Sequence, residues 1–290
     1  MIDLHLHSTS SDGQDSPSKI VDKALELNLR AIALTDHDTL SGLEEFLSYG
    51  EEKNIIVIPG IEISIKHEPE RELIDIHIIG LNIDHNSANL RKSIVDQIKG
   101  RLEQKRAICY RLRNEFGYDI SFKEVQEIAG SNIIGRPHIV EVMVRNNPDI
   151  TKGKSKNQLF KLISVGGSAY VDRIIELNLE KSIELILSAG GIPILAHPGI
   201  YNVSNFEHFM EMLIDVGIKG IEVEYTYSKN RPFYETKKLV EAQKTLPEYF
   251  RRIAEKYNLI KSGGSDYHGG KKGIKIGDAN VPDEYLKSFI

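Results

Sequence analysis

Short hydrophobic runs alternate with stretches of helical spacing over most of the chain, which favours a fold built from strands and helices in turn. Seven runs are typical of strands: 2–8, 31–38, 55–64, 73–83, 191–198, 218–225 and 259–268. The first two are each followed by a stretch whose apolar residues recur at helical intervals, 15–28 and 41–53. Strands that alternate with helices predict a parallel sheet with right-handed crossovers.

Two capping signals indicate where the first helices begin. Ser16 followed by Pro17 predicts an N-cap with proline in the first turn. Ser41 and Glu44 have the spacing of a capping box, which predicts the start of the second helix.

The pattern changes between the fourth and fifth strand-like runs. Residues 86–168 have helical spacing and frequent charges, without a comparably strong strand signal. The sequence therefore predicts an α/β fold, in which a distorted or closed barrel is formed by 1–85 and 169–290 and a helical domain is inserted at 86–168. An open, doubly wound sheet is the alternative.

Composition narrows the classes of partner. The formal net charge of −5 argues against stable binding to duplex nucleic acid or to an anionic membrane, although a local phosphate pocket stays compatible with it. The single cysteine, Cys109, excludes a disulfide framework and a thiolate zinc cluster, and it suits a reducing, cytoplasmic setting. Neither a signal peptide nor an apolar run of about 20 residues, the length that spans a bilayer, is visible.

Histidines and acids gather at the strand-like runs. His5 and His7 are two residues apart on the first run, so their side chains share one face and can converge on one ion. Asp12 and Gly13 end the Ser/Thr-rich loop that follows, where glycine allows a turn that a side chain would obstruct. Further candidates lie on or after later runs: His37, Glu62, His77, His197, Asp266 and His268. Because the C-terminal ends of parallel barrel strands meet at one mouth, we expect one site.

The types of side chain indicate metal chemistry. Imidazoles and carboxylates without thiolates suit Mn²⁺, Zn²⁺ or Fe²⁺. Nine candidates exceed the roughly four to six ligands of a single ion, so two or three ions are implied. Two acids flank His37: we interpret Asp36 as a residue that orients a ligand histidine, and Asp38 as a loop or N-cap carboxylate ahead of the second helix.

Read in order, the motifs HLHS…SDG, TDHD, GIEIS, HIIG, AHP and GGSDYHG resemble those of the PHP (polymerase and histidinol phosphatase) family of metal-dependent phosphoesterases. The resemblance covers most of the chain and implies a distorted (β/α)7 barrel with three divalent ions, Mn being expected and Zn or Fe the alternatives. It implies that one ion is held by His5, His7, Glu62 and Asp266. Glu62 would bridge to a second ion, held also by His77 and His197. The third would be held by Asp12, His37 and His268.

Within the family, the chain is similar to the subgroup of nucleoside 3′,5′-bisphosphate phosphatases and 5′-to-3′ exoribonucleases of the AM type. Its length, the helical insertion and the motif GRPHIV within it carry this similarity. The similarity implies that Arg136 and His138 bind a substrate phosphate, for which the planar fork of arginine is suited. The stretch 225–257 is longer than the subgroup leads us to expect, and a loop there could reshape the mouth of the site.

The predicted function is hydrolysis of phosphate esters by a metal-bound hydroxide, with Glu62, His197 and Asp266 as catalytic residues. The expected substrates are small nucleotides, such as nucleoside 3′,5′-bisphosphates, or short oligoribonucleotides. Two alternatives stay open. One is a hydrolase of carbon–nitrogen bonds, because amidohydrolase barrels also use histidines at strand ends, and the other is a non-catalytic PHP-like binding module. The sequence does not separate a phosphatase from an exonuclease, nor does it indicate the oligomeric state.

Overall fold

The computed structural model of the chain describes residues 1–130, 133–229, 236–270 and 273–290. The chain divides into two compact units. The first consists of Met1–Ile94 with Leu177–Ile290, and the second of Val95–Glu176. The assignment of a catalytic barrel to 1–85 and 169–290 and of a cap to 86–168 stays a prediction as to role.

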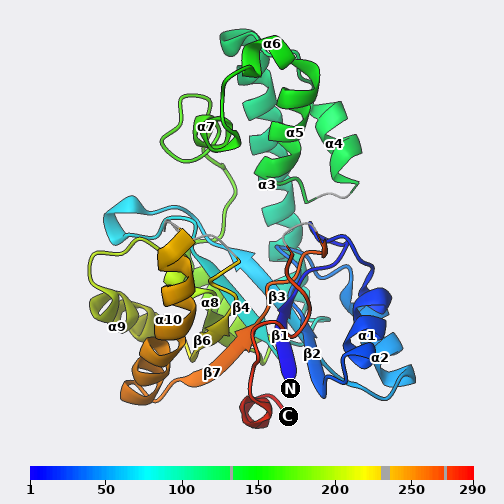
Figure 1. The fold of residues 1–290 in the computed structure, drawn as a ribbon, viewed down its shortest axis with the longest axis vertical. Coiled ribbons are helices and arrows are strands. Elements are labelled where there is room, and N and C mark those ends of the chain that lie inside the picture. The colour runs from blue at the N-terminus through cyan, green and yellow to red at the C-terminus, as the bar shows by residue number, and fades with distance from the viewer. Residues whose placement is uncertain (131–132, 230–235, 271–272) are drawn as a thin grey trace. The chain divides into compact units, whose positions relative to one another are not determined.

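In the described residues the first unit contains a seven-stranded sheet whose strands follow one another in chain order. The strands are β1 (Ile2–Leu6), β2 (Ala31–Leu34), β3 (Ile56–Ser64), β4 (His77–Leu81), β5 (Ile192–Leu195), β6 (Gly220–Tyr225) and β7 (Ile260–Gly264). Each lies within one of the predicted runs. The end of β7 returns to β1, where His7 N donates to Tyr267 O at 2.9 Å and Asp266 N to His5 O at 3.0 Å. The sheet is therefore a nearly closed barrel, as predicted (Figure 1).

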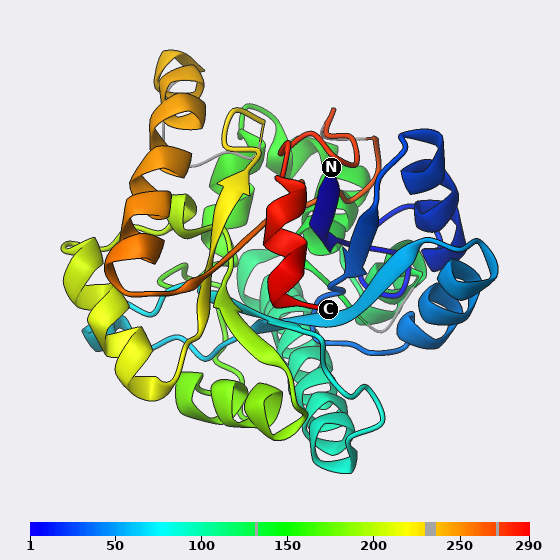
Figure 2. The same ribbon diagram turned by 90° about the horizontal axis from the view of Figure 1, so that it is seen from below.

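Helices surround this sheet (Figure 2). They are α1 (Pro17–Glu26), α2 (Leu43–Glu52), α8 (Leu179–Ser188), α9 (Phe206–Val216) and α10 (Thr236–Lys256). The predicted start of α1 is confirmed, because the Ser16 side chain accepts a hydrogen bond from Lys19 N and Pro17 lies in the first turn. The predicted capping box of α2 is wrong. Gly42 is the N-cap and makes no side-chain capping bond, while Ser41 N donates to Thr39 Oγ1 at 3.3 Å.

The fourth strand departs from the predicted all-parallel sheet. β4 is antiparallel to both β3 and β5, whereas the other neighbouring pairs are parallel. The connection between β3 and β4 contains a short 3-10 turn, η1 (Pro69–Arg71), and no crossover helix. Two neighbouring strands can be parallel only if a crossover connects them, so β4 runs antiparallel to β3. The reversal places the first residue of β4, His77, beside the last residue of β3, Ser64. Hydrophobic spacing predicts that a strand exists but not which way it runs.

The second unit is helical. The long helix α3 (Ala88–Phe116) begins in the first unit and continues into the second. It is followed by α4 (Phe122–Ala129), α5 (Arg136–Asn146), α6 (Pro148–Thr151) and α7 (Lys156–Leu162). The unit has its own hydrophobic core, which includes Ile108, Leu112, Val125, Ile139, Met143 and Leu159. Because these helices bury their apolar residues against one another, the helical spacing of those residues does not depend on packing against the sheet.

Both chain ends lie at the end of the barrel where β1 begins. The N-terminal amine pairs with Asp283, and Ile2 bridges to Val281. The 3-10 helix η4 (Asp283–Ser288) lies across this end, close to the N-terminus (Figure 2). The stretch 225–257 is the one predicted to be longer than in the subgroup. Its residues 230–235 lie outside the described part of the chain. Among the described helices, none has the length and apolar character required to cross a bilayer.

Candidate metal centre

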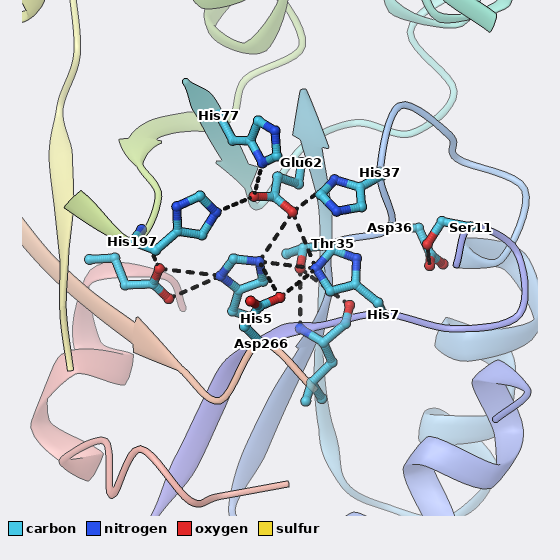
Figure 3. A network of polar contacts seen from close by, with 12 residues as sticks. His5, His7, Ser11, Thr35, Asp36, His37, Glu62, His77, His197 and Asp266 are labelled. Carbon is cyan, nitrogen blue, oxygen red and sulfur yellow. Dashed lines mark hydrogen bonds and ion pairs between the residues drawn. The ribbon is translucent and has the colours of Figure 1, made fainter. Parts of the chain in front are cut away.

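The predicted ligands come from six different strands or the segments next to them, and they lie at one edge of the barrel (Figure 3). Their potential ligand atoms form four overlapping groups, and within each group these atoms lie within 4.8 Å of one another. The groups are His7–Asp12–His37–His268, His5–His7–Asp266, His5–Glu62–His197 and His37–Glu62–His77. All nine predicted residues are thus brought together.

His77 reaches this edge because β4 is reversed. The ligands on the parallel strands stand at or beyond the carboxyl ends of β2, β5 and β7, whereas His77 is the first residue of its strand. In an antiparallel strand the amino end lies at the carboxyl ends of its neighbours. The prediction of one mouth therefore holds for His77 through a strand direction that the sequence did not reveal.

Glu62 is the hub of the cluster, and its side chain is fully buried. One carboxylate oxygen, Oε1, lies 2.9 Å from both His77 Nδ1 and His197 Nε2. The other, Oε2, faces three further imidazole nitrogens, at 3.0 Å for His37 Nδ1 and 3.2 Å for His5 Nε2 and His7 Nε2. Burial alone would raise the pKa of Glu62, but the charges of the surrounding histidines outweigh it and hold the pKa well below its usual value.

Two further acids complete the cluster on the side of β1. Asp266 Oδ1 lies 3.2 Å from His7 Nε2 and 3.2 Å from His268 Nδ1. Asp12 Oδ1 lies 3.3 Å from His268 Nε2. Burial opposes ionisation of Asp12, yet the charges of His268 and His37 hold its pKa well below the ordinary value. Asp12 is therefore ionised, as a metal ligand must be.

The loop that carries Asp12 is held by Asp36. The Asp36 carboxylate accepts hydrogen bonds from Ser8 N at 2.7 Å, from Ser8 Oγ at 2.6 Å and from Ser11 Oγ. The prediction that Asp36 orients a ligand histidine is wrong, because its oxygens face the loop, away from the imidazoles (Figure 3). A Cβ at Gly13 would lie 2.2 Å from His7 O, so the expected need for glycine in this turn is confirmed.

Asp38 lies in the loop ahead of α2, as one of its two interpretations has it, and is not the N-cap. It is buried, has a φ of 48°, and does not cap α2, which begins at Leu43. Its N–H donates to Glu62 O at 2.8 Å, and its Oδ1 accepts from Ser64 N at 2.9 Å. Asp38 therefore ties the segment after β2 to β3 at Glu62 and Ser64. The left-handed backbone at this position was not visible in the sequence.

Sequence reasoning missed the contribution of β6. Glu222 Oε1 lies 3.1 Å from His5 Nδ1, and its Oε2 accepts from His197 N at 2.6 Å. The hydroxyl of Tyr225 donates to Asp266 Oδ2 at 2.7 Å. In the sequence, Glu222 and Glu224 share one face of the sixth strand and either could reach the mouth, but neither was assigned a role. Nothing in the sequence pointed to Tyr225.

The residues fit divalent ions. His5 Nε2 and His7 Nε2 approach to 3.1 Å, and the buried nitrogens His7 Nδ1 and His197 Nδ1 have no hydrogen-bond partner. Burial, and then the charges of His268 and His37, lower the pKa of His7, which favours the neutral imidazole that binds a metal. Six imidazoles and three carboxylates in such a cluster form the donor set of Mn²⁺, Zn²⁺ or Fe²⁺.

Arg136 and His138 lie at the start of α5 in the second unit, where both are half-buried. Arg136 Nη1 donates to Ser164 Oγ at 3.1 Å. His138 Nδ1 accepts a hydrogen bond from Gly135 N at 3.1 Å and so caps the helix. Their predicted role in binding a substrate phosphate stays a prediction.

Comparison with known proteins adds to the geometry. A model of the PHP domain matches residues 3–175. A 5′-3′ exoribonuclease of Haemophilus influenzae is 30% identical over 281 residues, which cover 95% of this chain and 92% of the relative. A 3′,5′-nucleoside bisphosphate phosphatase of Chromobacterium violaceum is 28% identical over 280 residues, which cover 95% of this chain and 90% of the relative.

A solved structure is similar over nearly the whole chain. It is described as an amidohydrolase from Chromobacterium violaceum with bound sulfate and no metal. It superimposes with a TM-score of 0.76 at 26% sequence identity and covers 99% of this chain and 96% of its own. Similarity thus extends over both units and is not confined to the motifs.

Proposed function

The chain belongs to the PHP domain family, as its motifs predicted, and from that membership we propose that it is a metal-dependent hydrolase of phosphate esters. The observation that carries the proposal is the position of Glu62, whose two oxygens face two separate sets of imidazoles inside one buried cluster. A carboxylate in this position suits two neighbouring divalent ions.

The proposed ligand sets follow the contacts. Glu62 would bridge one ion, held with His5, His7 and Asp266, and a second ion, held with His77 and His197. The distances around Glu62 and Asp266 support this division. A third ion would be held by Asp12, His37 and His268, whose ligand atoms form one group with His7. Manganese is the expected metal, with zinc or iron as the alternatives.

The residues of the chain prepare the site for this chemistry. Divalent ions bound there would supply an activated water and offset the charge that develops on the phosphoryl oxygens. Glu62, His197 and Asp266 would act by holding those ions in place. The depressed pKa values of Glu62 and Asp12 keep both groups ionised, so ligand binding does not first require a proton to leave them.

The proposed substrates are phosphorylated nucleotides or short RNAs. The two relatives are a nucleoside bisphosphate phosphatase and an exoribonuclease, and both reactions break a bond between phosphorus and oxygen. Arg136 and His138 are proposed to bind a second phosphate of such a substrate, since a guanidinium and an imidazole N–H are both donors to phosphate oxygens.

The proposal is tested by measuring phosphate and nucleotide release with Mn²⁺ present. The substrates are nucleoside 3′,5′-bisphosphates, short 5′-phosphorylated RNAs and a set of cyclic amides. We expect hydrolysis of at least one phosphorylated class and a loss of activity by orders of magnitude in His7→Ala. The matched control is His208→Ala, since the side chain of His208 is 83% exposed in α9, and it should retain full activity.

Besides the absence of any phosphate-ester hydrolysis by the wild-type protein, two outcomes would reject the proposal. One is hydrolysis of amides without hydrolysis of any phosphate ester, which would favour the carbon–nitrogen hydrolase that the description of the solved relative allows. The other is undiminished phosphate release by a folded His7→Ala protein. Comparing bisphosphates with RNAs of increasing length separates a phosphatase from an exonuclease within the proposal.

A further inference from the structure

Strand β6 contributes none of the nine proposed ligands, yet two of its side chains contact them. Glu222 contacts His5 and His197, and Tyr225 contacts Asp266. Residues three apart on a regular strand point to opposite faces. A second feature of β6 must therefore bring both side chains to the same side.

That feature is a break in register between β6 and β7. Glu222 is opposite Ser262, whereas Glu224 is opposite Gly263 and Tyr225 is opposite Gly264. Two residues of β6 thus advance while β7 advances by one, which is the signature of a β-bulge. A bulge re-aims the side chains that follow it, so Tyr225 turns toward the edge that Glu222 already faces.

Glu222 fixes the direction of His5. Both side chains are fully buried, and both Glu222 oxygens lie within 3.3 Å of His5 Nδ1. A carboxylate accepts the Nδ1 proton, which leaves the Nε2 lone pair facing the cluster, 3.2 Å from Glu62 Oε2. This arrangement of a carboxylate behind a histidine sets the ring orientation and strengthens the imidazole as a ligand.

The same carboxylate also fixes His197. Glu222 Oε2 accepts from His197 N at 2.6 Å, and His197 has a φ of 28°, in the region that residues with a side chain rarely adopt. A strong backbone hydrogen bond offsets the cost of holding that conformation. One buried acid therefore positions ligands on both sides of Glu62.

Tyr225 completes the arrangement at Asp266. Its hydroxyl donates a hydrogen bond to Asp266 Oδ2, and the other oxygen, Oδ1, faces His7 Nε2 at 3.2 Å. Asp266 also has a left-handed backbone, with a φ of 55°. Constraining one oxygen selects which oxygen is presented to an ion.

We propose that Glu222 and Tyr225 are positioning residues that set the affinity of the ion held by His5, His7 and Asp266. This inference rests on the proposed metal-dependent function and adds residues to it. It assigns the bulge of β6 a role that stability alone does not require. Both would act through the ligands that they contact, His5 and His197 for Glu222 and Asp266 for Tyr225.

The test measures ion binding itself. Wild-type protein, Glu222→Gln and Tyr225→Phe are stripped with a chelator and then titrated with Mn²⁺ in a calorimeter, and the bound ion is counted after gel filtration. A glutamine presents one acceptor where the carboxylate presents two, and phenylalanine removes only the hydroxyl. Two matched controls come from the same region: Glu224→Gln, whose carboxylate pairs with Arg251, and Tyr285→Phe, whose hydroxyl faces Glu224.

We expect the ion held by His5, His7 and Asp266 to bind about 10–100-fold more weakly in each positioning variant. In Glu222→Gln the ion held with His197 should weaken as well, because Glu222 also fixes His197. The third ion and both controls should be unchanged. Saturating Mn²⁺ should restore phosphate release, and the metal-free melting temperatures should stay near that of the wild type. Unaltered ion binding in both variants would overturn the inference, as would an equal loss in the controls. If Glu222→Gln does not fold, Tyr225→Phe decides alone.

The two proposals can fail separately. If wild-type protein binds ions but releases no phosphate from any substrate, the proposed function fails while the comparison of affinities still decides the inference. If wild-type protein binds no divalent ion, both are rejected.

Discussion

At the scale of single residues, opposed effects on charge decide what the site can hold. Burial would keep Glu62 and Asp12 protonated, but the histidines around them outweigh it. His7 shows the converse, because burial and neighbouring positive charges favour its neutral form. The ionised acids and the neutral imidazole of His7 offer lone pairs to an ion. Burial would lower the pKa of His5, but Glu222 and Glu62 raise it well above its usual value, so an ion that binds His5 must displace a proton.

A residue outside this cluster leads to a prediction about pH. Burial would raise the pKa of Asp15, but hydrogen bonds from Lys19, Lys23 and Tyr267 hold it at about 2, below the ordinary 3.8. Because the folded state binds the proton less tightly, this carboxylate stabilises the fold fully above pH 3.8, and the contribution is lost as the pH falls toward 2. Asp15→Asn should lower the free energy of unfolding by about 1–2 kcal/mol at pH 7, after allowance for the exposure of the lysines.

Urea unfolding at pH 7 and near pH 3 checks this expectation. The difference between wild type and Asp15→Asn should shrink at the lower pH. Asp22→Asn is the control, since Asp22 is an exposed acid of the same helix α1. A difference that is constant between the two pH values would contradict the assignment.

At the scale of elements, features set by neighbouring residues could be predicted from the sequence, whereas features set by contacts between distant segments could not. The seven strands and the cap at Ser16 follow from local spacing, and the nine cluster residues were identified because they lie in short motifs beside those strands. The direction of β4 depends on a turn that lacks a crossover helix, and the role of Tyr225 depends on a bulge against β7. The direction of a strand and a bulge are both set by pairing between two strands, so the spacing of residues within one strand does not predict them.

The loop after β1 gives a prediction at this scale. Gly13→Ala places a Cβ against the backbone at His7, where 2.2 Å is far below van der Waals contact, so the loop must move and take Asp12 with it. We expect the ion proposed for Asp12, His37 and His268 to be lost first, together with about 1–3 kcal/mol of stability.

The measurements are the number of Mn²⁺ ions bound and the free energy of unfolding. Gly270→Ala is the control, because a Cβ there meets no atom within 4 Å. Wild-type ion stoichiometry in Gly13→Ala would show that the position of the loop does not govern the third ion.

At the scale of the whole molecule, the contacts that close the barrel also bring the proposed ligands together. The bonds that join β7 to β1 run through the proposed ligands themselves, from Asp266 N to His5 O and from His7 N to Tyr267 O. Ligands from the two ends of the chain meet only in the folded state. An ion that binds them therefore binds the native chain and not the unfolded one.

Adding Mn²⁺ to chelated protein should consequently raise its stability. At a free concentration of 100 times the dissociation constant, one site contributes about 2.7 kcal/mol, and the melting temperature should rise with ion concentration. Calorimetric scans with chelator and with increasing Mn²⁺ measure this effect. The expectation fails if the melting temperature is independent of Mn²⁺, or if it rises equally in His7→Ala.

The most direct measurement of the central claim is anomalous X-ray scattering at the manganese edge from crystals grown with Mn²⁺. The account predicts two or three anomalous peaks among the nine side chains, two of them on either side of Glu62, the first near His5, His7 and Asp266 and the second near His77 and His197. Crystals that show well-ordered side chains at this edge of the barrel, with no anomalous peak among them, would contradict it.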